Sequence, residues 1–185
     1  MNWNDHSNID GLHAFLGGSK YHWLNYDEEK LSTTYRNMIA KERGTKLHEF
    51  AAMCINLRQK LPRSKRTLNS YVNDSINLSM KAEQPLFFSE NCFGTADAIS
   101  FKKDILTIHD LKTGVIPAHI EQLEIYAALF CLEYRIKPAD IHIDLKIYQN
   151  DEILYHDPQA DEIAPIMEKI VTFDKIIKNI QKEER

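Results

Sequence analysis

The sequence predicts an α/β fold of the α+β kind, with a central mixed β-sheet that includes an antiparallel hairpin and is flanked by helices. Two β-rich runs, FGTADAISF and ILTIHDLKT, are separated by only a short polar stretch, as in a hairpin. A further run, IHIDLKIYQ, alternates in the manner of a strand. Before, between and after these runs, apolar residues recur at helical spacing.

The segment before the hairpin predicts helix, followed by a stretch without a clear pattern. From about residue 27 to residue 61, apolar residues recur at helical spacing, with an interruption near Gly44 and an end before Pro62. We expect one broken helix or two consecutive helices there. Residues 63–90 show no single period and receive no assignment.

The hairpin strands are expected over residues 93–101 and 105–113. After them, the pattern predicts a helix from about Pro117 to Tyr134. Residues 141–149 then predict a strand. The last elements follow a turn at Asn150-Asp151 and are a short strand, EILYH, and an amphipathic helix from Pro165 onward.

Length and charge limit the organisation and the partners of the chain. Its 185 residues fit a single domain, with an N-terminal helical and aromatic segment (1–43), a core (44–150) and a C-terminal hairpin strand and helix (151–185). The formal net charge of -4 argues against coating nucleic acid or an anionic membrane through bulk charge. No apolar run reaches the roughly 18–20 residues that span a bilayer, and the N-terminus lacks signal-peptide features. We therefore expect a soluble cytoplasmic protein with no membrane partner.

Cysteine usage predicts free thiols. Cys54, Cys92 and Cys131 are widely spaced and lie among apolar residues, a pattern that favours buried thiols in a reducing compartment over disulfides. Because no C-x-x-C pair occurs, neither a zinc site nor an iron-sulfur site is expected.

Three charged residues lie inside hairpin strands that otherwise resemble core: Asp97, Asp110 and Lys112. Side chains alternate along a strand, so Asp110 and Lys112 share one face. If the turn consists of two residues, Lys103-Asp104, then Asp97 lies directly opposite Asp110. A three-residue turn would shift that register by one.

Two opposed carboxylates repel each other unless positive charge lies between them, and Mg²⁺ or Mn²⁺ is the usual partner of oxygen ligands. Lys112 is placed to hold a water beside such a cation. A Lewis acid, a metal-activated water and a nearby ammonium are what metal-assisted phosphodiester hydrolysis requires. The alternative is that the two aspartates cap turns and that Lys112 pairs with one of them at the surface.

Four short motifs occur around these residues. They are Gly44-Thr45-Lys46-Leu47-His48-Glu49, Gly94-Thr95-Ala96-Asp97, Asp110-Leu111-Lys112-Thr113-Gly114 and Gln122-Leu123-Glu124-Ile125-Tyr126. Together they resemble the PD-(D/E)XK nuclease superfamily, in its RecB-like branch, which includes many phage exonucleases. The resemblance covers residues 44–150 and implies a restriction-endonuclease-like core in which this segment is the catalytic part.

The resemblance also implies roles for individual residues. It implies four ligands for Mg²⁺ or Mn²⁺, namely His48, Asp97, Asp110 and the backbone carbonyl of Leu111. It implies that Lys112 orients the attacking water, and that Gln122 and Tyr126 support the active site and contact the DNA strand. Gln122 and Tyr126 are four apart on the expected helix and so share a face. The cysteines of the iron-sulfur cluster found in some relatives are absent, so no cluster is expected.

The function implied by this resemblance is that of a metal-dependent DNA nuclease, with an exonuclease favoured over an endonuclease. It would be encoded by a phage or prophage, act in recombination, repair or DNA processing, and work in the cytoplasm of a bacterial host. A homo-oligomer or a recombination partner protein is possible. The alternative is a catalytically silent protein that retains the nuclease fold and binds or scaffolds DNA.

Two regions are candidates for contact with DNA. The densest run of positive charge is expected to contact phosphates without reading the base sequence, and consists of Arg58, Lys60, Arg63, Lys65 and Arg66. A solvated helix end is the alternative for this run. The N-terminal aromatics Tyr21, Trp23 and Tyr26 are expected to pack on the core, the alternative being that they stack on unpaired bases.

Overall fold

The computed structural model describes residues 5–9 and 11–184. The chain divides into two units, residues 1–43 and residues 44–185. The first unit contains two short 3-10 helices, η1 (Ser7–Ile9) and η2 (Gly18–Asn25), and the beginning of helix α1 (Glu28–Asn56).

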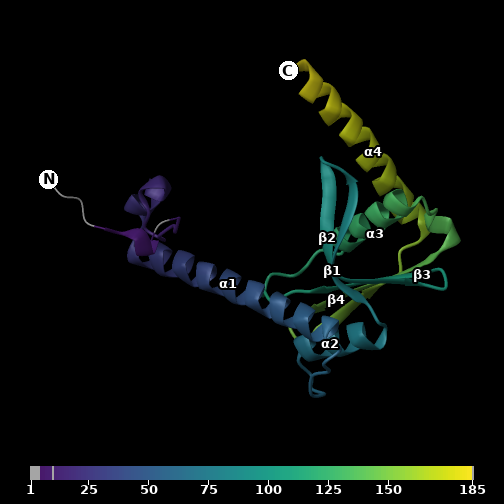
Figure 1. The fold of residues 1–185 in the computed structure, drawn as a ribbon, viewed down its shortest axis with the longest axis horizontal. Helices are drawn as coiled ribbons and strands as arrows, with labels where there is room; N and C mark the ends of the chain where they lie inside the picture. The colour runs from purple at the N-terminus through teal and green to yellow at the C-terminus, as the bar shows by residue number, and fades with distance from the viewer. Residues whose placement is uncertain (1–4, 10, 185) are drawn as a thin grey trace. The chain divides into compact units, whose positions relative to one another are not determined.

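The second unit contains the rest of α1 and a mixed five-stranded sheet flanked by helices (Figure 1). This arrangement confirms the α+β class that the sequence predicts. In chain order its further elements are α2 (Thr67–Asn77), β1 (Lys81–Ser89), β2 (Cys92–Lys102), β3 (Ile105–Leu111), α3 (Glu121–Tyr134), η3 (Pro138–Asp140), β4 (His142–Gln149), β5 (Glu152–His156) and α4 (Ala160–Glu183).

The strands follow one another across the sheet in the order β1-β2-β3-β4-β5. All neighbours are antiparallel except β3 and β4, which are parallel and are joined by α3 as the crossover helix. The turn between β2 and β3 consists of Lys103 and Asp104, both with positive φ (51° and 60°). Two successive left-handed residues are what a tight two-residue hairpin needs, so the shorter of the two predicted turns is the correct one.

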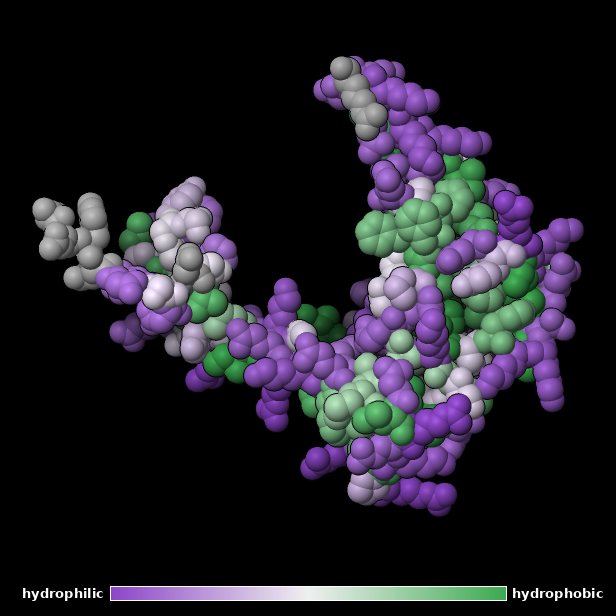
Figure 2. Space-filling view, in the orientation of Figure 1, coloured by the Kyte–Doolittle hydropathy of each residue, from purple (hydrophilic) through white to green (hydrophobic). Residues whose placement is uncertain are grey.

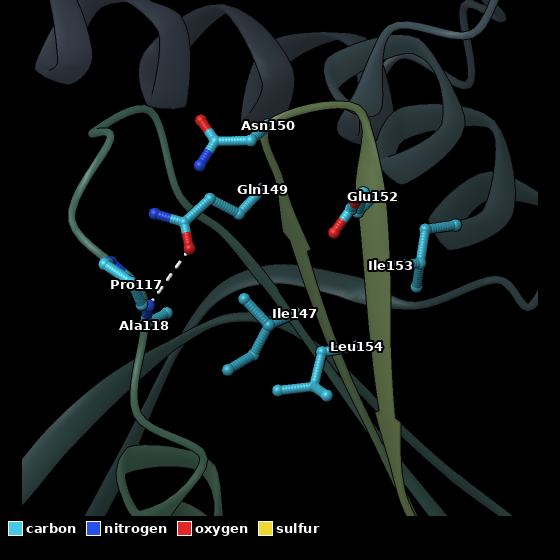
Figure 3. Close-up of a pocket in the computed structure, with 8 residues that line it drawn as sticks. All are labelled: Pro117, Ala118, Ile147, Gln149, Asn150, Glu152, Ile153 and Leu154. Carbon is cyan, nitrogen blue, oxygen red and sulfur yellow. Dashed lines mark hydrogen bonds between the residues drawn. The ribbon is translucent and has the colours of Figure 1, made fainter.

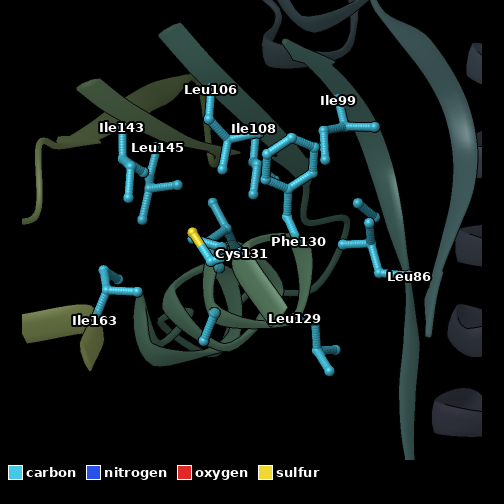
Figure 4. Packing of buried hydrophobic residues seen from close by; sticks show 14 of the residues in the cluster. Leu86, Ile99, Leu106, Ile108, Leu129, Phe130, Cys131, Ile143, Leu145 and Ile163 are labelled. Carbon is cyan, nitrogen blue, oxygen red and sulfur yellow. The ribbon is translucent and has the colours of Figure 1, made fainter. Parts of the chain in front are cut away.

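One face of the sheet packs against α3 and the first turns of α4 (Figure 4). α3 is rich in alanine and leucine, which favour helix, and it buries side chains on most of its circumference. Each large apolar side chain buried here contributes about 1.5–3 kcal/mol. The buried residues of this core include Leu86, Leu106, Ile108, Leu129, Cys131, Ile143, Leu145 and Ile163.

The opposite face packs against α2 and the C-terminal turns of α1. A second core joins Cys54 and Ile55 of α1 and Tyr71 of α2 to Leu111 and Tyr148 of the sheet. The sheet is therefore covered by helices on both sides. Helices on both faces explain why its central strands, β3 and β4, are rich in apolar residues.

α1 corrects two sequence expectations. The helix continues through Gly44, so the predicted interruption is wrong. Gly44 is buried, and a Cβ there would lie 2.7 Å from the side-chain oxygen of Thr113, so this glycine permits a close approach instead of breaking the helix. α1 ends at Asn56, well before Pro62, because Arg58 adopts a left-handed conformation (φ 54°) and the following amide of Gln59 bonds back to Cys54.

Other boundaries also differ from expectation. α3 begins at Glu121 and not near Pro117, since the preceding residues form a loop. α4 begins at Ala160, because Gln159 and Glu162 form a capping box ahead of Pro165. The unassigned residues 63–90 contain α2 and β1.

Thiol burial follows the prediction for two of the three cysteines. Cys54 and Cys131 are buried, whereas Cys92 is only half-buried. The prediction that all three are buried is therefore wrong for Cys92.

Hydrophobic residues gather at the tip of the β1–β2 hairpin, next to the hydrophilic outer end of α4 (Figure 2). Phe87 and Phe93 pair across the two strands there, with their ring centroids 6.4 Å apart, and both are exposed. The tip is attached to α4 because Ser89 and Asn91 both donate hydrogen bonds to Asp174. Among the helices of residues 5–9 and 11–184, none is long and apolar enough to cross a membrane.

Candidate metal centre

The candidate site lies where β2 separates from β3. Their pairing runs from Lys102 opposite Ile105 to Ala98 opposite His109, and the same register places Asp97 opposite Asp110, as a two-residue turn predicts. Beyond Ala98 the β1–β2 ribbon turns away from β3 and β4 (Figure 1). There a side chain of β2 contacts the backbone of β3: the backbone N–H of Leu111 donates a hydrogen bond to Asp97 Oδ2 at 2.9 Å.

Glu83 belongs to β1 and lies opposite Asp97 of β2. β1 pairs with the edge of β2 that does not pair with β3. The β1–β2 register passes from Ala82–Ala98 to Gln84–Ala96, and between these pairs Glu83 has a positive φ of 49°. Ala96 packs in the core beneath α3, whereas Ala98 packs in the opposite core, although a regular pleat would put both on one face. The ribbon therefore twists locally at Glu83 and Asp97.

Asp110 is almost completely buried, with 1% of its surface exposed. The ammonium Nζ of Lys112 lies 3.2 Å from Asp110 Oδ1, to which it donates a hydrogen bond, and 3.0 Å from Oδ2. Within the described part of the chain, Oδ2 accepts no hydrogen bond. Oδ2 therefore has the charge of Lys112 beside it but accepts no directed hydrogen bond, which leaves this oxygen able to bind a cation.

A hydrogen-bond chain links Lys112 to α3. Lys112 Nζ donates to Gln122 Oε1 at 2.7 Å, and Gln122 Nε2 donates to the hydroxyl of Tyr126 at 2.9 Å. Gln122 and Tyr126 share a helix face, as their spacing predicts. The ring of Tyr126 fits against β2 because residue 94 is glycine: a Cβ there would lie 2.7 Å from Tyr126 Cε1.

Gly94→Ala is expected to displace the Tyr126 ring and weaken its bond to Gln122. Forcing a methyl group into this contact should cost about 1–3 kcal/mol in the free energy of unfolding, which urea denaturation would measure. Gly114→Ala is the matched control, because a Cβ at Gly114 meets nothing within 4 Å. Equal stability of the two variants would contradict the proposed contact.

His48 approaches the same site from α1. Its Nδ1 lies 3.4 Å from Asp97 Oδ2. His48, Glu83 and Asp97 each offer one ligand atom, and these atoms lie within 4.8 Å of one another, as in a group that could hold a metal ion. Asp110 is not a member of this group, and Leu111 contacts Asp97 through its N–H. The structure thus brings two of the predicted ligands, His48 and Asp97, together with Glu83, whereas Asp110 and the carbonyl of Leu111 as ligands stay predictions.

Sequence reasoning missed Glu83 because it left residues 63–90 unassigned. Ala82, Leu86 and Phe88 fall on alternate positions, which is a strand signal, but Pro85 within the run argues against a strand. No local pattern indicates that residue 83 adopts a positive φ.

Burial and mutual repulsion dominate the electrostatics of the two aspartates. Burial raises the pKa of Asp97, although the N–H of Leu111 and His48 oppose this and Glu83 adds to it. Burial, followed by the charge of Asp97, raises the pKa of Asp110 to about 6, although Lys112 opposes this. Each ionised carboxylate therefore makes ionisation of the other less favourable, and a divalent cation would relieve this repulsion.

The residues present fit a divalent cation. Carboxylate oxygens are the preferred ligands of Mg²⁺, and a set that adds an imidazole also suits Mn²⁺. Oδ2 of Asp110, which is buried and accepts no hydrogen bond, is a further candidate oxygen ligand.

Glu83→Gln is expected to weaken Mn²⁺ binding at least about tenfold, because it keeps the size of the side chain but removes a charged ligand. Isothermal titration calorimetry would measure the change. Glu90→Gln, at the exposed tip of the same hairpin, is the control and should bind as the unaltered protein does. If both variants bind Mn²⁺ equally well, Glu83 is not a ligand.

Gln149, at the end of β4, organises the loop between β3 and α3 (Figure 3). Its Oε1 accepts a hydrogen bond from the N–H of Ala118 at 3.0 Å, and its Nε2 donates to the carbonyls of Gly114 and Ile116 at 2.7 Å each. The same residue lines a cavity of about 270 Å³ next to Pro117. Sequence reasoning missed Gln149, since its partners are more than thirty residues away in the chain.

A second group of possible ligands lies apart from these residues and has a structural explanation. His156 Nε2 of β5 lies 3.1 Å from Glu124 Oε1 of α3 and 3.6 Å from Glu162 Oε1 of α4. The other oxygen of Glu162 accepts the N–H of Gln159 in the capping box. This cluster therefore fastens three elements together.

The basic residues expected to contact DNA lie in and around the connection between α1 and α2. All five are exposed: Arg58, Lys60, Arg63, Lys65 and Arg66. Asn73 anchors the connection by bonding both the N–H and the carbonyl of Leu61. These exposed side chains, on a connection whose backbone is anchored at Leu61, are compatible with phosphate contact. That contact stays a prediction.

Comparison with known proteins found no relatives. No protein-family model, no curated protein and no solved structure matches the chain. What the site does is therefore inferred from its own geometry and chemistry.

Proposed function

We propose that the protein is a metal-dependent nuclease that hydrolyses phosphodiester bonds in DNA. We assign it to the RecB-like branch of the PD-(D/E)XK superfamily, with a restriction-endonuclease-like core, and favour an exonuclease over an endonuclease. We further propose that a phage or prophage encodes it for DNA recombination, repair or processing. The observation that carries the proposal is the buried Asp110, which lies opposite Asp97, forms an ion pair with Lys112 and has one oxygen that accepts no hydrogen bond.

The proposed mechanism assigns each group a separate task. When bound, Mg²⁺ or Mn²⁺ would lower the pKa of a water and stabilise negative charge on the phosphate. Asp97 and Asp110 would hold the cation, together with His48, Glu83 and the carbonyl of Leu111. Lys112 is placed to orient the attacking water and to stabilise developing negative charge.

Gln122 and Tyr126 support this role of Lys112. Gln122 accepts a hydrogen bond from the Lys112 ammonium, and Tyr126 accepts one from Gln122. An ammonium held between Asp110 and Gln122 loses little freedom when the substrate binds, which favours catalysis. The groups expected of a catalyst are all present, whereas a catalytically silent relative would be expected to have lost one.

End-labelled linear, nicked and closed circular DNA, each incubated with Mg²⁺ or Mn²⁺ and separately with a chelator, would test the proposal. We expect cleavage only with the cation, and digestion of linear but not closed circular DNA if the enzyme is an exonuclease. Cleavage of the circle would identify an endonuclease. No cleavage of any DNA with either cation would overturn the proposal.

A further inference from the structure

The N-terminal unit contains a cavity of its own, with a volume of about 400 Å³. That volume lies within the range of small-molecule sites, roughly 300–1,000 Å³. The cavity forms between the segment that includes η2 and the first turns of α1. Its lining residues are Phe15, Lys20, Trp23, Tyr26, Thr34, Asn37, Met38 and Lys41.

Aromatic side chains form the walls of this cavity and are held in position without being fully buried. Trp23 Nε1 donates a hydrogen bond to the carbonyl of Gly17 at 3.1 Å, which fixes the plane of the indole. The ring of Phe15 meets that of Tyr35 edge-on, with centroids 5.1 Å apart. No residue of η2 is buried, and Phe15, Trp23 and Tyr26 are each half-buried. These rings therefore present open surface to the cavity.

The polar groups at the cavity are cationic or neutral. Lys20 and Lys41 line it, and no aspartate or glutamate is among its lining residues within the described part of the chain. Asn37 also lines it and is exposed. An amide can both donate and accept hydrogen bonds. The ligand that fits this set is aromatic, carries hydrogen-bonding edges and is anionic.

We propose that this cavity binds one unpaired nucleotide of a single-stranded nucleic acid. The base stacks on the aromatic walls, an arrangement that tolerates any base. Asn37 bonds an edge of the base, and the two lysines contact the adjoining phosphates. The site shares no residue with the metal centre and does not require that the protein cleave DNA.

Trp23 fluorescence provides a local test with the full chain. The chain has two tryptophans, so Trp3→Phe leaves Trp23 as the single reporter. The probe is pentadeoxyadenylate, added in the presence of a chelator so that no cleavage occurs. We expect saturable quenching of Trp23, and the absence of quenching would overturn the proposal.

Variants distinguish the cavity from other surfaces. Tyr26→Ala should weaken binding about tenfold through lost stacking. Lys20→Gln combined with Lys41→Gln leaves the walls intact, and should lower the slope of log affinity against log salt by about 1.4. Tyr21→Ala and Lys103→Gln are the controls, since neither residue lines the cavity. Unchanged binding by the double lysine variant, or an equal loss in the controls, would overturn the proposal.

Two further outcomes separate this site from the proposed nuclease activity. If the protein cleaves DNA but Trp23 does not respond to the oligonucleotide, only the cavity proposal fails. If Trp23 responds but no cleavage occurs with any cation, only the nuclease proposal fails. Quenching by an uncharged aromatic peptide, with none by the oligonucleotide, would indicate that the cavity binds a protein segment and not a nucleotide. This result would overturn the proposal.

Discussion

Asp110→Asn is expected to abolish metal-dependent cleavage while making the metal-free protein more stable. Loss of a cation ligand removes several kcal/mol of transition-state stabilisation, which corresponds to a rate loss on the order of a thousandfold. The gain in stability has a separate cause. Asp110 is buried opposite Asp97, and its pKa is raised to about 6, so its negative charge at neutral pH opposes folding.

Thermal unfolding at neutral pH would measure both effects on one pair of samples. In a chelator, Asp110→Asn should unfold at a higher temperature than the unaltered protein. With Mn²⁺, the unaltered protein should gain stability and the variant should gain little, because a ligand that binds only the folded state raises its stability. A variant that is less stable in the chelator, yet binds Mn²⁺ normally, would contradict the role of Asp110.

Lys112→Gln is the second change with a large expected effect. Turnover should fall on the order of a thousandfold, because the ammonium that orients water and stabilises charge is lost. Mn²⁺ binding should persist, since Lys112 is not a ligand. In the metal-free protein, however, the variant leaves the charge of Asp110 buried without its partner, which should cost about 1–3 kcal/mol of stability.

The two partners of this ion pair are thus expected to shift stability in opposite directions. Asp144 and Lys146 offer a matched control, because they also lie two residues apart in the chain and are 3.1 Å apart, but are more exposed at the carboxylate, 24% against 2%. Lys146→Gln should change stability by less than about 1 kcal/mol. Loss of Mn²⁺ binding in Lys112→Gln would contradict the proposal that Lys112 orients water without binding the cation.

The register of the hairpin could be predicted from the sequence because turn length determines it. A two-residue turn at Lys103-Asp104 leaves only one pairing that puts Asp97 opposite Asp110. The shared face of Gln122 and Tyr126 followed equally from helical periodicity. Both predictions depend on local geometry, and short sequence windows contain that information.

The parts of the site that could not be predicted depend on contacts distant in the chain. The sequence predicts a helix break near Gly44, whereas the structure shows that this glycine permits close contact with Thr113, far along the sequence. Glu83 reaches the site only because of a local twist with positive φ in a strand whose pattern Pro85 obscures. Gln149 holds a loop more than thirty residues away. None of these relationships leaves a periodic signature.

The most direct test of the central claim is the initial rate of linear DNA cleavage as Mn²⁺ is varied, measured for the unaltered protein beside Asp110→Asn. The proposal expects the rate of the unaltered protein to rise with Mn²⁺ to a plateau, and to stop when chelator is added. Asp110→Asn should remain at the background rate at every concentration. Equal rates for the two proteins, or cleavage that persists in the chelator, would contradict a metal-dependent nuclease centred on Asp110.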